Sequence, residues 1–227
     1  MLEEIKNAGL EFETNVVDDA DWENNWKQYY KPLEIGDRLI VVPEWEETEL
    51  NGRVPLRLDP GLMFGTGSHA TTRMCLEALQ NFELEGKRVL DLGCGSGILG
   101  IGALVLGAGS CVGCDIDPKA PDVVMDNAAL NGIGADRLKV YAGDIIGDAT
   151  LRRSLGSGYD IVLANIVSDV IIPLAPLVRP FMAQGAVFIT SGIIDGRESD
   201  VATALRSAGF EIKKHLHEEE WHCYICK

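Results

Sequence analysis

The stretch VLDLGCGSGILG, residues 89–100, brings closely spaced glycines directly after a short apolar run. Glycine lets a chain turn sharply from a strand into a helix and lets a ligand touch the backbone. Two patterns overlap here. A GxGxxG pattern, typical of dinucleotide-binding proteins, starts at Gly95, and a GxGxG pattern preceded by Asp91 starts at Gly93. The stretch predicts a strand, a glycine loop and a helix, and it leaves two classes of ligand open.

The charge of the ligand separates the two patterns. The pyrophosphate of a dinucleotide is an anion that binds N–H groups at a helix N-terminus without a competing carboxylate. S-adenosylmethionine has no phosphate, and its sulfonium and ammonium cations tolerate a nearby acid. Asp91, at the predicted end of the strand, therefore favours S-adenosylmethionine. In this interpretation the cofactor-binding glycines are Gly93, Gly95 and Gly97. Gly100 then packs the helix against the sheet.

A second acid supports a nucleoside ligand of either class. The run CVGCDIDP, residues 111–118, places Asp115 at the tip of the next predicted strand. A carboxylate at that position binds ribose hydroxyls. Both candidate ligands contain an adenosine ribose, so Asp115 does not choose between them. Asp117 is the weaker candidate because it already precedes Pro118 in the turn.

Composition limits the class of protein. With 227 residues, 46% of them hydrophobic, the chain can form one catalytic domain and a small appendage. The net charge of −15 argues against a nucleic-acid surface, which needs clustered Lys and Arg, and would steer a basic protein or a cationic small molecule. No apolar run of about 18 residues and no signal-peptide pattern are present, which predicts no membrane contact and a cytoplasmic location.

From about residue 87 onward, short apolar runs alternate with helical patterns, which indicates βαβ units around a parallel sheet in an α/β fold. The expected strands cover residues 87–92, 110–115, 137–141, 159–164 and 185–190. Two later runs, FEIKKHLH and WHCYICK, are joined by acidic residues and predict a closing antiparallel hairpin. Prolines at 173, 176 and 180 predict a broken or late-starting helix.

The first 60 residues differ in character. Trp22, Trp26 and Tyr29 recur at helical spacing and predict a packing cap, with a substrate-binding role as the alternative. Two predicted strands, RLIVVP and RVPLRL, follow them.

Four of the six cysteines form two CxxC pairs, Cys111 with Cys114 and Cys223 with Cys226. Both pairs lie in strand-like runs, where residues i and i+3 point to opposite faces, and a zinc site needs converging thiolates. We therefore expect buried strand cysteines and no metal, although His215, His217 and His222 lie near the second pair in the sequence.

Further motifs give a wider resemblance. The runs LDPGLMFGTGSHATTRMCLEAL (residues 58–79), VLDLGCGSGILG, DIDPKA, DNAALNG, DIVLANI, SGI and EEEW resemble, in order and spacing, the bacterial methyltransferases of the eleventh protein of the large ribosomal subunit. The resemblance covers roughly residues 22–227. It implies a Rossmann-like seven-stranded class I methyltransferase sheet with helices on both faces.

The resemblance also implies which residues bind S-adenosylmethionine. In that family, the positions that match Thr72, Gly93, Asp115 and Asn165 bind the cofactor. The loop that includes Phe64 and His69 would fold over the cofactor, with Thr71 and Thr72 at a helix start where an ordinary N-cap is the alternative role. The full predicted set is Phe64, His69, Thr71, Thr72, Asp91, Gly93, Gly95, Gly97, Asp115 and Asn165.

Asn165 is the predicted catalytic residue. It stands in LANI after the fourth strand, where many amino-group methyltransferases carry an Asn-Pro-Pro motif. Its amide oxygen would accept N–H groups of an incoming amine and aim the lone pair of that amine. The alternative role is a turn asparagine after a strand. No residue stands out as a general base.

The expected organisation is an N-terminal linker or remnant over residues 1–55 and a methyltransferase domain over residues 56–227, acting as a monomer. The resemblance implies a separate N-terminal substrate-recognition domain, of which this chain carries little. The expected activity is methyl transfer from S-adenosylmethionine to lysine or N-terminal amines of the ribosomal protein. The alternatives are another protein or a small amine as substrate, an NAD-dependent oxidoreductase, and a non-catalytic cofactor-binding protein.

Overall fold

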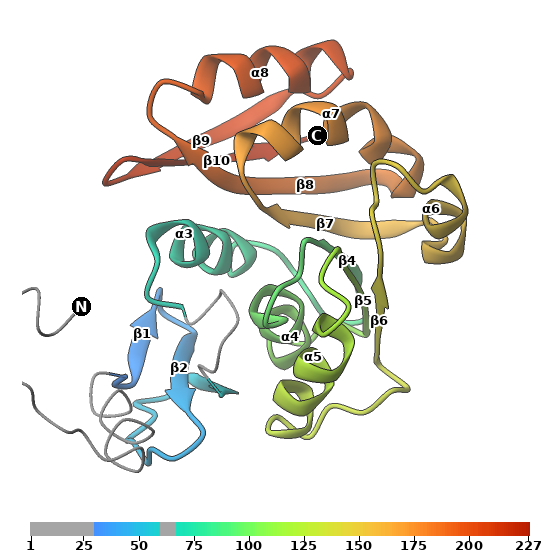
Figure 1. The fold of residues 1–227 in the computed structure, drawn as a ribbon. Coiled ribbons are helices and arrows are strands. Elements are labelled where there is room, and N and C mark those ends of the chain that lie inside the picture. Colours follow the sequence, from blue (N-terminus) through green and yellow to red (C-terminus); the bar gives the residue numbers. More distant parts are fainter. Residues whose placement is uncertain (1–29, 60–66) are drawn as a thin grey trace, which may run out of the picture. The chain divides into compact units, whose positions relative to one another are not determined.

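The computed structural model describes residues 30–59 and 67–227 (Figure 1). The chain divides into two compact units, Met1–Lys31 and Pro32–Lys227, and every element below belongs to the second. The predicted cap of Trp22, Trp26 and Tyr29 lies outside the described residues, as does Phe64. Within the described ranges, no helix has the length and apolar character needed to cross a membrane.

A seven-stranded sheet forms the centre of this unit, in the order β6-β5-β4-β7-β8-β10-β9. Strands β4 to β8 run parallel, and β10 runs antiparallel to β8 and β9. The predicted α/β fold, its strands and its closing hairpin are confirmed. The strands are β4 (Arg88–Leu92), β5 (Ser110–Asp115), β6 (Leu138–Ala142), β7 (Tyr159–Asn165), β8 (Met182–Ile194), β9 (Ile212–Glu218) and β10 (Trp221–Cys226).

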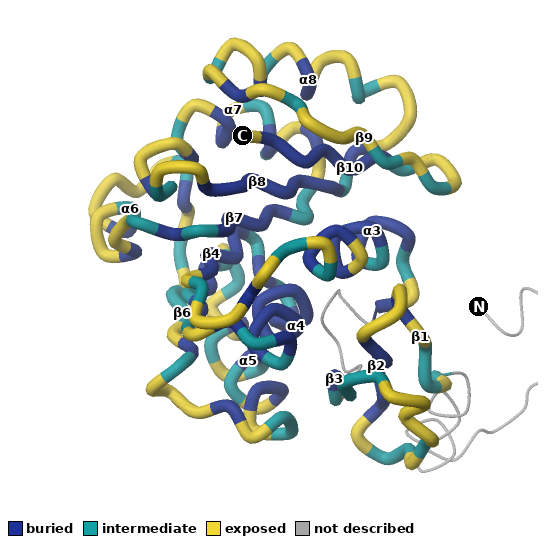
Figure 2. Tube along the Cα trace, turned by 180° about the vertical axis from the view of Figure 1, so that it is seen from behind, coloured by how far each residue is buried: buried dark blue, intermediate teal, exposed yellow. Residues whose placement is uncertain are grey.

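Helices cover both faces of the sheet. Side chains that alternate along β4 enter two different hydrophobic clusters, Val89 on one face and Leu90 on the other, as the period of a strand requires. Figure 1 shows β7 and β8 with α7 on one side and α3 on the other, and Figure 2 shows that β8 and β10 are buried along most of their length. One layer contains α3 (Ala70–Leu79), α4 (Ile98–Val105) and α5 (Ala120–Ala129), and the other contains α6 (Ala149–Leu155), α7 (Ser168–Val178) and α8 (Glu198–Ser207).

The prediction of a broken or late-starting helix near the prolines is wrong. Helix α7 runs without interruption through Pro173 and Pro176, and a short 3-10 turn, η2 (Arg179–Phe181), holds Pro180. All three prolines lie on the exposed side of this segment. Water can bind the carbonyl groups that proline leaves without an N–H donor on that side, so the helix continues.

A separate three-stranded sheet precedes α3. It consists of β1 (Leu33–Ile35), β2 (Leu39–Pro43) and β3 (Val54–Leu58), with β1 antiparallel and β3 parallel to β2. The side chains of β3 pack against α4 in the main hydrophobic cluster. The compact unit thus begins at Pro32, and a boundary between residues 55 and 56 falls inside β3.

The six cysteines are buried and unbridged, five of them in strands or helix and Cys94 in the glycine loop. Burial raises the pKa of the Cys111 thiol well above its usual value. The prediction of buried strand cysteines is therefore confirmed for both CxxC pairs.

Candidate active site

The strand order of the main sheet creates a place for a ligand. The chain adds β5 and β6 on one side of β4 and then returns to add β7 and β8 on the other side. Open parallel sheets bind ligands at such a reversal, beyond the carboxyl ends of the strands. A cavity of about 580 Å³ lies there. Its walls come from the start of α3, the glycine loop after β4, the ends of β5, β6 and β7, and single residues of α7, β8 and β10.

Most of the predicted site residues meet in this cavity. The lining includes His69, Thr71, Thr72, Gly93, Gly95, Asp115 and Asn165. Asp91 and Gly97 do not line it, and Phe64 lies outside the described residues. The structure thus brings together residues from four parts of the sequence that separate motifs had indicated.

The glycine loop has the conformation that the GxGxG pattern requires. Gly93, Gly95 and Gly97 have φ angles of 72°, 52° and 83°, in the left-handed region that favours glycine. Gly100 has no such angle. A Cβ atom there would lie 2.8 Å from Cys111 Sγ. The predicted packing role of Gly100, between helix and sheet, is therefore confirmed.

Two carboxylates accept hydrogen bonds from N–H groups of the glycine loop and of the first turn of α4. Asp115 accepts a hydrogen bond from the N–H of Gly95 at 2.8 Å, and Asp91 accepts one from the N–H of Gly100 at 2.9 Å. A pyrophosphate would need these same donors and would meet two acids beside them. The geometry therefore disfavours a dinucleotide and is compatible with a ligand that carries no phosphate.

Asp91 lies behind the loop and only 1% of it is exposed. Burial raises its pKa to about 7. The hydrogen bond from Gly100 lowers this pKa, and the negative charge of Asp115 raises it further. Its Oδ1 atom has no hydrogen-bond partner among the described residues. Asp91 therefore acts on the shape and charge of the loop from behind the cavity wall.

Asn165 contacts the start of α3 in the cavity wall. Its amide nitrogen donates to Thr72 Oγ1 at 3.2 Å, which leaves the amide oxygen available to accept from a ligand. Thr72 does not cap the helix. The N-cap is His69, whose Nδ1 lies 2.8 Å from Thr71 Oγ1 and whose ring contacts Trp221 edge-to-face at 4.8 Å.

Two contributors were missed by sequence reasoning. Ile116, which is 74% exposed, and Trp221 both line the cavity and offer apolar surfaces at its rim. An apolar residue between two acids in DIDP was a signal for Ile116, because loops of that composition are usually polar throughout. Trp221 comes from the last strand, and no local pattern links it to the glycine loop.

A third missed residue acts from behind the loop. Asn127 is buried in α5, donates from Nδ2 to the Ser96 carbonyl at 2.9 Å and accepts from the Asp59 N–H at 2.9 Å. It ties the glycine loop to the end of β3. The motif DNAALNG contained Asn127, but only the fold shows which loop it reaches.

Comparisons with known proteins identify a family for the chain. The family model described as Ribosomal protein L11 methyltransferase (PrmA) matches residues 2–227. The chain is similar to two proteins named ribosomal protein L11 methyltransferase. It is 47% identical to that of Lachnospira eligens over 209 residues, which is 90% of this chain and 65% of that protein. It is 39% identical to that of Clostridium botulinum strain Eklund 17B over 232 residues, covering 100% of this chain and 72% of that protein.

A solved structure is similar in fold and sequence. It is the crystal structure of the ribosomal protein L11 methylase from Lactobacillus delbrueckii subsp. bulgaricus, with a TM-score of 0.78 and 28% identity. The match covers 87% of this chain and 98% of that chain. The chain thus spans about two thirds of the length of its curated relatives and nearly all of this solved chain.

Proposed function

The chain belongs to the ribosomal protein L11 methyltransferase family, and from that premise we propose that it transfers methyl groups from S-adenosylmethionine to amino groups of ribosomal protein L11. The acceptors are lysine side chains, the N-terminal amine, or both. One observation carries the proposal: Asn165 and Asp115 line the same cavity as the glycine loop. A ribosomal substrate would place this reaction in the cytoplasm.

The residues of the cavity fit this cofactor. Asp115 has a carboxylate at the cavity wall, and each of its oxygens accepts a single backbone N–H. A carboxylate oxygen has a second lone pair, so Asp115 can also accept from two ribose hydroxyls. Ile116 and Ile145 line the same region and offer apolar surface to a flat base. Bound S-adenosylmethionine supplies a methyl group activated by its positively charged sulfur.

The site must also orient the amine that accepts the methyl group. Thr72 holds the amide of Asn165 through its hydroxyl, and the amide oxygen then accepts an N–H from the neutral amine. This contact directs the nitrogen lone pair toward the bound cofactor. Holding two reactants in attack geometry lowers a barrier by roughly 7 to 11 kcal/mol. We assign no general base, and we propose that water accepts the proton that the amine loses on methylation.

The cofactor class is tested first. Calorimetry with S-adenosylhomocysteine and, separately, with NAD measures the affinity of the purified protein for each. We expect S-adenosylhomocysteine to bind and NAD to give no heat, because the N–H groups of Gly95 and Gly100 are already bonded to carboxylates. Binding of NAD alone would favour the oxidoreductase and refute the proposal.

The substrate is tested separately. The protein is incubated with S-adenosylmethionine and purified ribosomal protein L11, and intact-mass spectrometry counts the added methyl groups. An Asn165→Ala variant is the matched control. The proposal predicts added multiples of one methyl mass with the wild type only. A wild-type protein that binds cofactor but methylates a small amine or another protein in a parallel panel, and not L11, would overturn the substrate assignment.

A further inference from the structure

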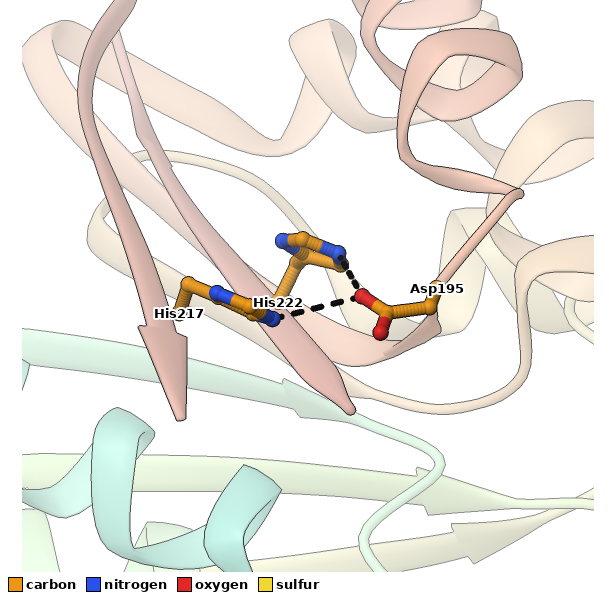
Figure 3. Close-up of side chains that lie close together, drawn as sticks. All are labelled: Asp195, His217 and His222. Carbon is orange, nitrogen blue, oxygen red and sulfur yellow. Dashed lines mark hydrogen bonds and ion pairs between the residues drawn. The ribbon is translucent and has the colours of Figure 1, made fainter. Parts of the chain in front are cut away.

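Three polar side chains converge at the end of the sheet that holds β8, β9 and β10. They are Asp195, His217 and His222, which we call the His–Asp cluster (Figure 3). Asp195 Oδ1 lies 2.7 Å from His222 Nε2 and 3.2 Å from His217 Nε2. One donor atom of each residue lies within 4.8 Å of the others. Both imidazoles thus point at one carboxylate oxygen.

The backbone brings these residues together. His217 and His222 are directly opposite each other in the β9–β10 hairpin, so their side chains lie on the same face. Their rings stack with centroids 4.3 Å apart at 11°. Asp195 follows β8, and its N–H donates to the carbonyl of Glu220 in the hairpin turn at 2.9 Å. The site is therefore fixed by main-chain contacts and does not depend on long flexible side chains.

A further histidine orients one of the rings. His222 Nδ1 lies 2.8 Å from His215 Nε2, which holds His222 with its Nε2 toward Asp195. Histidines that bind metal ions characteristically use their other ring nitrogen in such a hydrogen bond. His222 is 6% exposed, so this orientation is also held by packing.

Glu198 lies next to the His–Asp cluster, outside the group of atoms that are within 4.8 Å of one another. Its Oε2 atom is buried, has no hydrogen-bond partner in the described part of the chain, and lies 4.0 Å from His222 Nε2. A buried carboxylate oxygen without a hydrogen bond is costly, and a cation beside it removes that cost. Glu198 comes from the first turn of α8, an element that contributes no other residue to the cluster.

We propose that the His–Asp cluster binds a divalent transition-metal ion of the zinc class, with Glu198 as a fourth ligand. Imidazole nitrogen and carboxylate oxygen are ligands of Zn²⁺ at about 2.0 to 2.2 Å. Bonds of that length at tetrahedral angles separate the ligand atoms by about 3.3 to 3.6 Å. The Asp195–His217 spacing of 3.2 Å is close to this range, and the Asp195–His222 spacing of 2.7 Å would widen on binding. The side chains of Asp195 and His217 are 58% and 50% exposed, so an ion can enter from solvent.

Such an ion would support the cavity wall without touching the reacting atoms. Trp221 lines the cavity and is followed directly by His222. Gly192, also in the lining, lies three residues before Asp195 on the same strand segment. A metal ion would link the ends of β8, β9 and β10 to the start of α8. This inference goes beyond the proposed function and does not depend on the identity of the methyl acceptor.

The test measures metal binding directly. The chelator-treated 227-residue protein is titrated with Zn²⁺ in a calorimeter and with Co²⁺ in an absorption spectrometer. We expect one ion per chain, a higher melting temperature with Zn²⁺, and visible Co²⁺ bands without the charge-transfer bands of thiolate ligands. The six cysteines are buried, so thiolate bands would indicate binding to other groups and would overturn the assignment. The absence of Zn²⁺ heat or of Co²⁺ bands would do the same.

Variants test whether Zn²⁺ binds at the His–Asp cluster or elsewhere on the protein. His217→Ala, at a half-exposed site, should weaken Zn²⁺ binding at least tenfold, and His215→Ala should weaken it roughly 10- to 100-fold by loosening His222. Asp200→Asn is the matched control, because Asp200 lies in α8 and pairs with Arg197 outside the cluster. Equal Zn²⁺ affinity of His217→Ala and Asp200→Asn would refute the site. Circular dichroism confirms that each variant is folded.

Discussion

Replacement of Asn127 by alanine tests how the glycine loop is held in its binding conformation. Asn127 makes two hydrogen bonds of 2.9 Å, to the Ser96 carbonyl inside the loop and from the Asp59 N–H after β3. Each such bond contributes about 0.5 to 1.5 kcal/mol net. Loss of both should lower the free energy of unfolding by about 1 to 3 kcal/mol. The loop would also lose its link to α5.

Asn131 provides a matched control one helical turn later. Its side chain bonds to the backbone of Arg57 in β3 at 2.8 Å and 2.7 Å and to the carbonyl of Asn127 at 2.8 Å. It makes no bond to the glycine loop. Asn131→Ala removes three such bonds, so it should lower the free energy of unfolding by about 1.5 to 4.5 kcal/mol, at least as much as Asn127→Ala, and still keep the affinity for cofactor.

Two measurements decide the outcome. Urea unfolding gives the free energy of unfolding of both variants, and calorimetry gives their affinity for S-adenosylhomocysteine. We expect Asn127→Ala to bind about tenfold more weakly than Asn131→Ala, a difference of about 1.4 kcal/mol, because the loop must be ordered during binding. Equal affinities of the two variants, or an Asn127→Ala protein as stable as the wild type, would refute this account of the loop.

Three further predictions concern the acids and the amide of the site. Asp115→Asn should weaken S-adenosylhomocysteine binding about tenfold or more in calorimetry, since a charge-assisted hydrogen bond contributes about 1.5 to 3 kcal/mol, whereas Asp117→Asn should not. Burial raises the pKa of Asp91 from 3.8 to about 7, so the folded state holds a proton that the unfolded chain has lost between these values. The free energy of unfolding of the wild type, measured against Asp91→Asn, should therefore fall as the pH rises from about 4 to 7 and stay flat above that range; a flat difference throughout would contradict the raised pKa. Asn165→Ala should lower the rate of methyl transfer about 100-fold or more at saturating cofactor in a labelled-methyl assay, and an unchanged rate would exclude the amide from orienting the amine.

The periodicity of the sequence predicted the strands of the main sheet because burial forces local apolar runs there. The closing hairpin was also predictable, since two apolar runs flank a short acidic turn. The course of α7 was not, because the effect of Pro173 and Pro176 depends on which side of the helix faces water. That side is set by packing against α8 and β8, which follow α7 in the chain.

The cavity residues also fall into two groups: some are marked by a local sequence motif, and others depend on contacts between segments distant in the sequence. The glycine loop, Asp115 and Asn165 were each marked by a motif at a strand end, where sheet topology brings them together. Asn127 and Trp221 act through contacts with segments about 30 or more residues away. The His–Asp cluster likewise joins Asp195 to His222 across 27 positions, so the spacing rules that excluded a zinc site at the CxxC pairs could not detect it.

The role of Asp91 shows why burial must be known before charge is used as an argument. In the sequence, Asp91 counted as a fixed anion that would repel a pyrophosphate. In the folded chain its pKa is about 7, so near neutral pH it carries its charge only part of the time. The stronger obstacle to a pyrophosphate is that the backbone N–H groups it would need already donate hydrogen bonds to Asp91 and Asp115.

A bound sulfonium cation near the loop would favour the ionised form of Asp91 and lower its pKa. Asp91 then contributes to binding through the ligand's own charge, and S-adenosylmethionine should gain affinity relative to the uncharged thioether product as the pH rises toward 7. Asp91→Asn should remove that pH dependence, and calorimetry of both ligands at several pH values measures it.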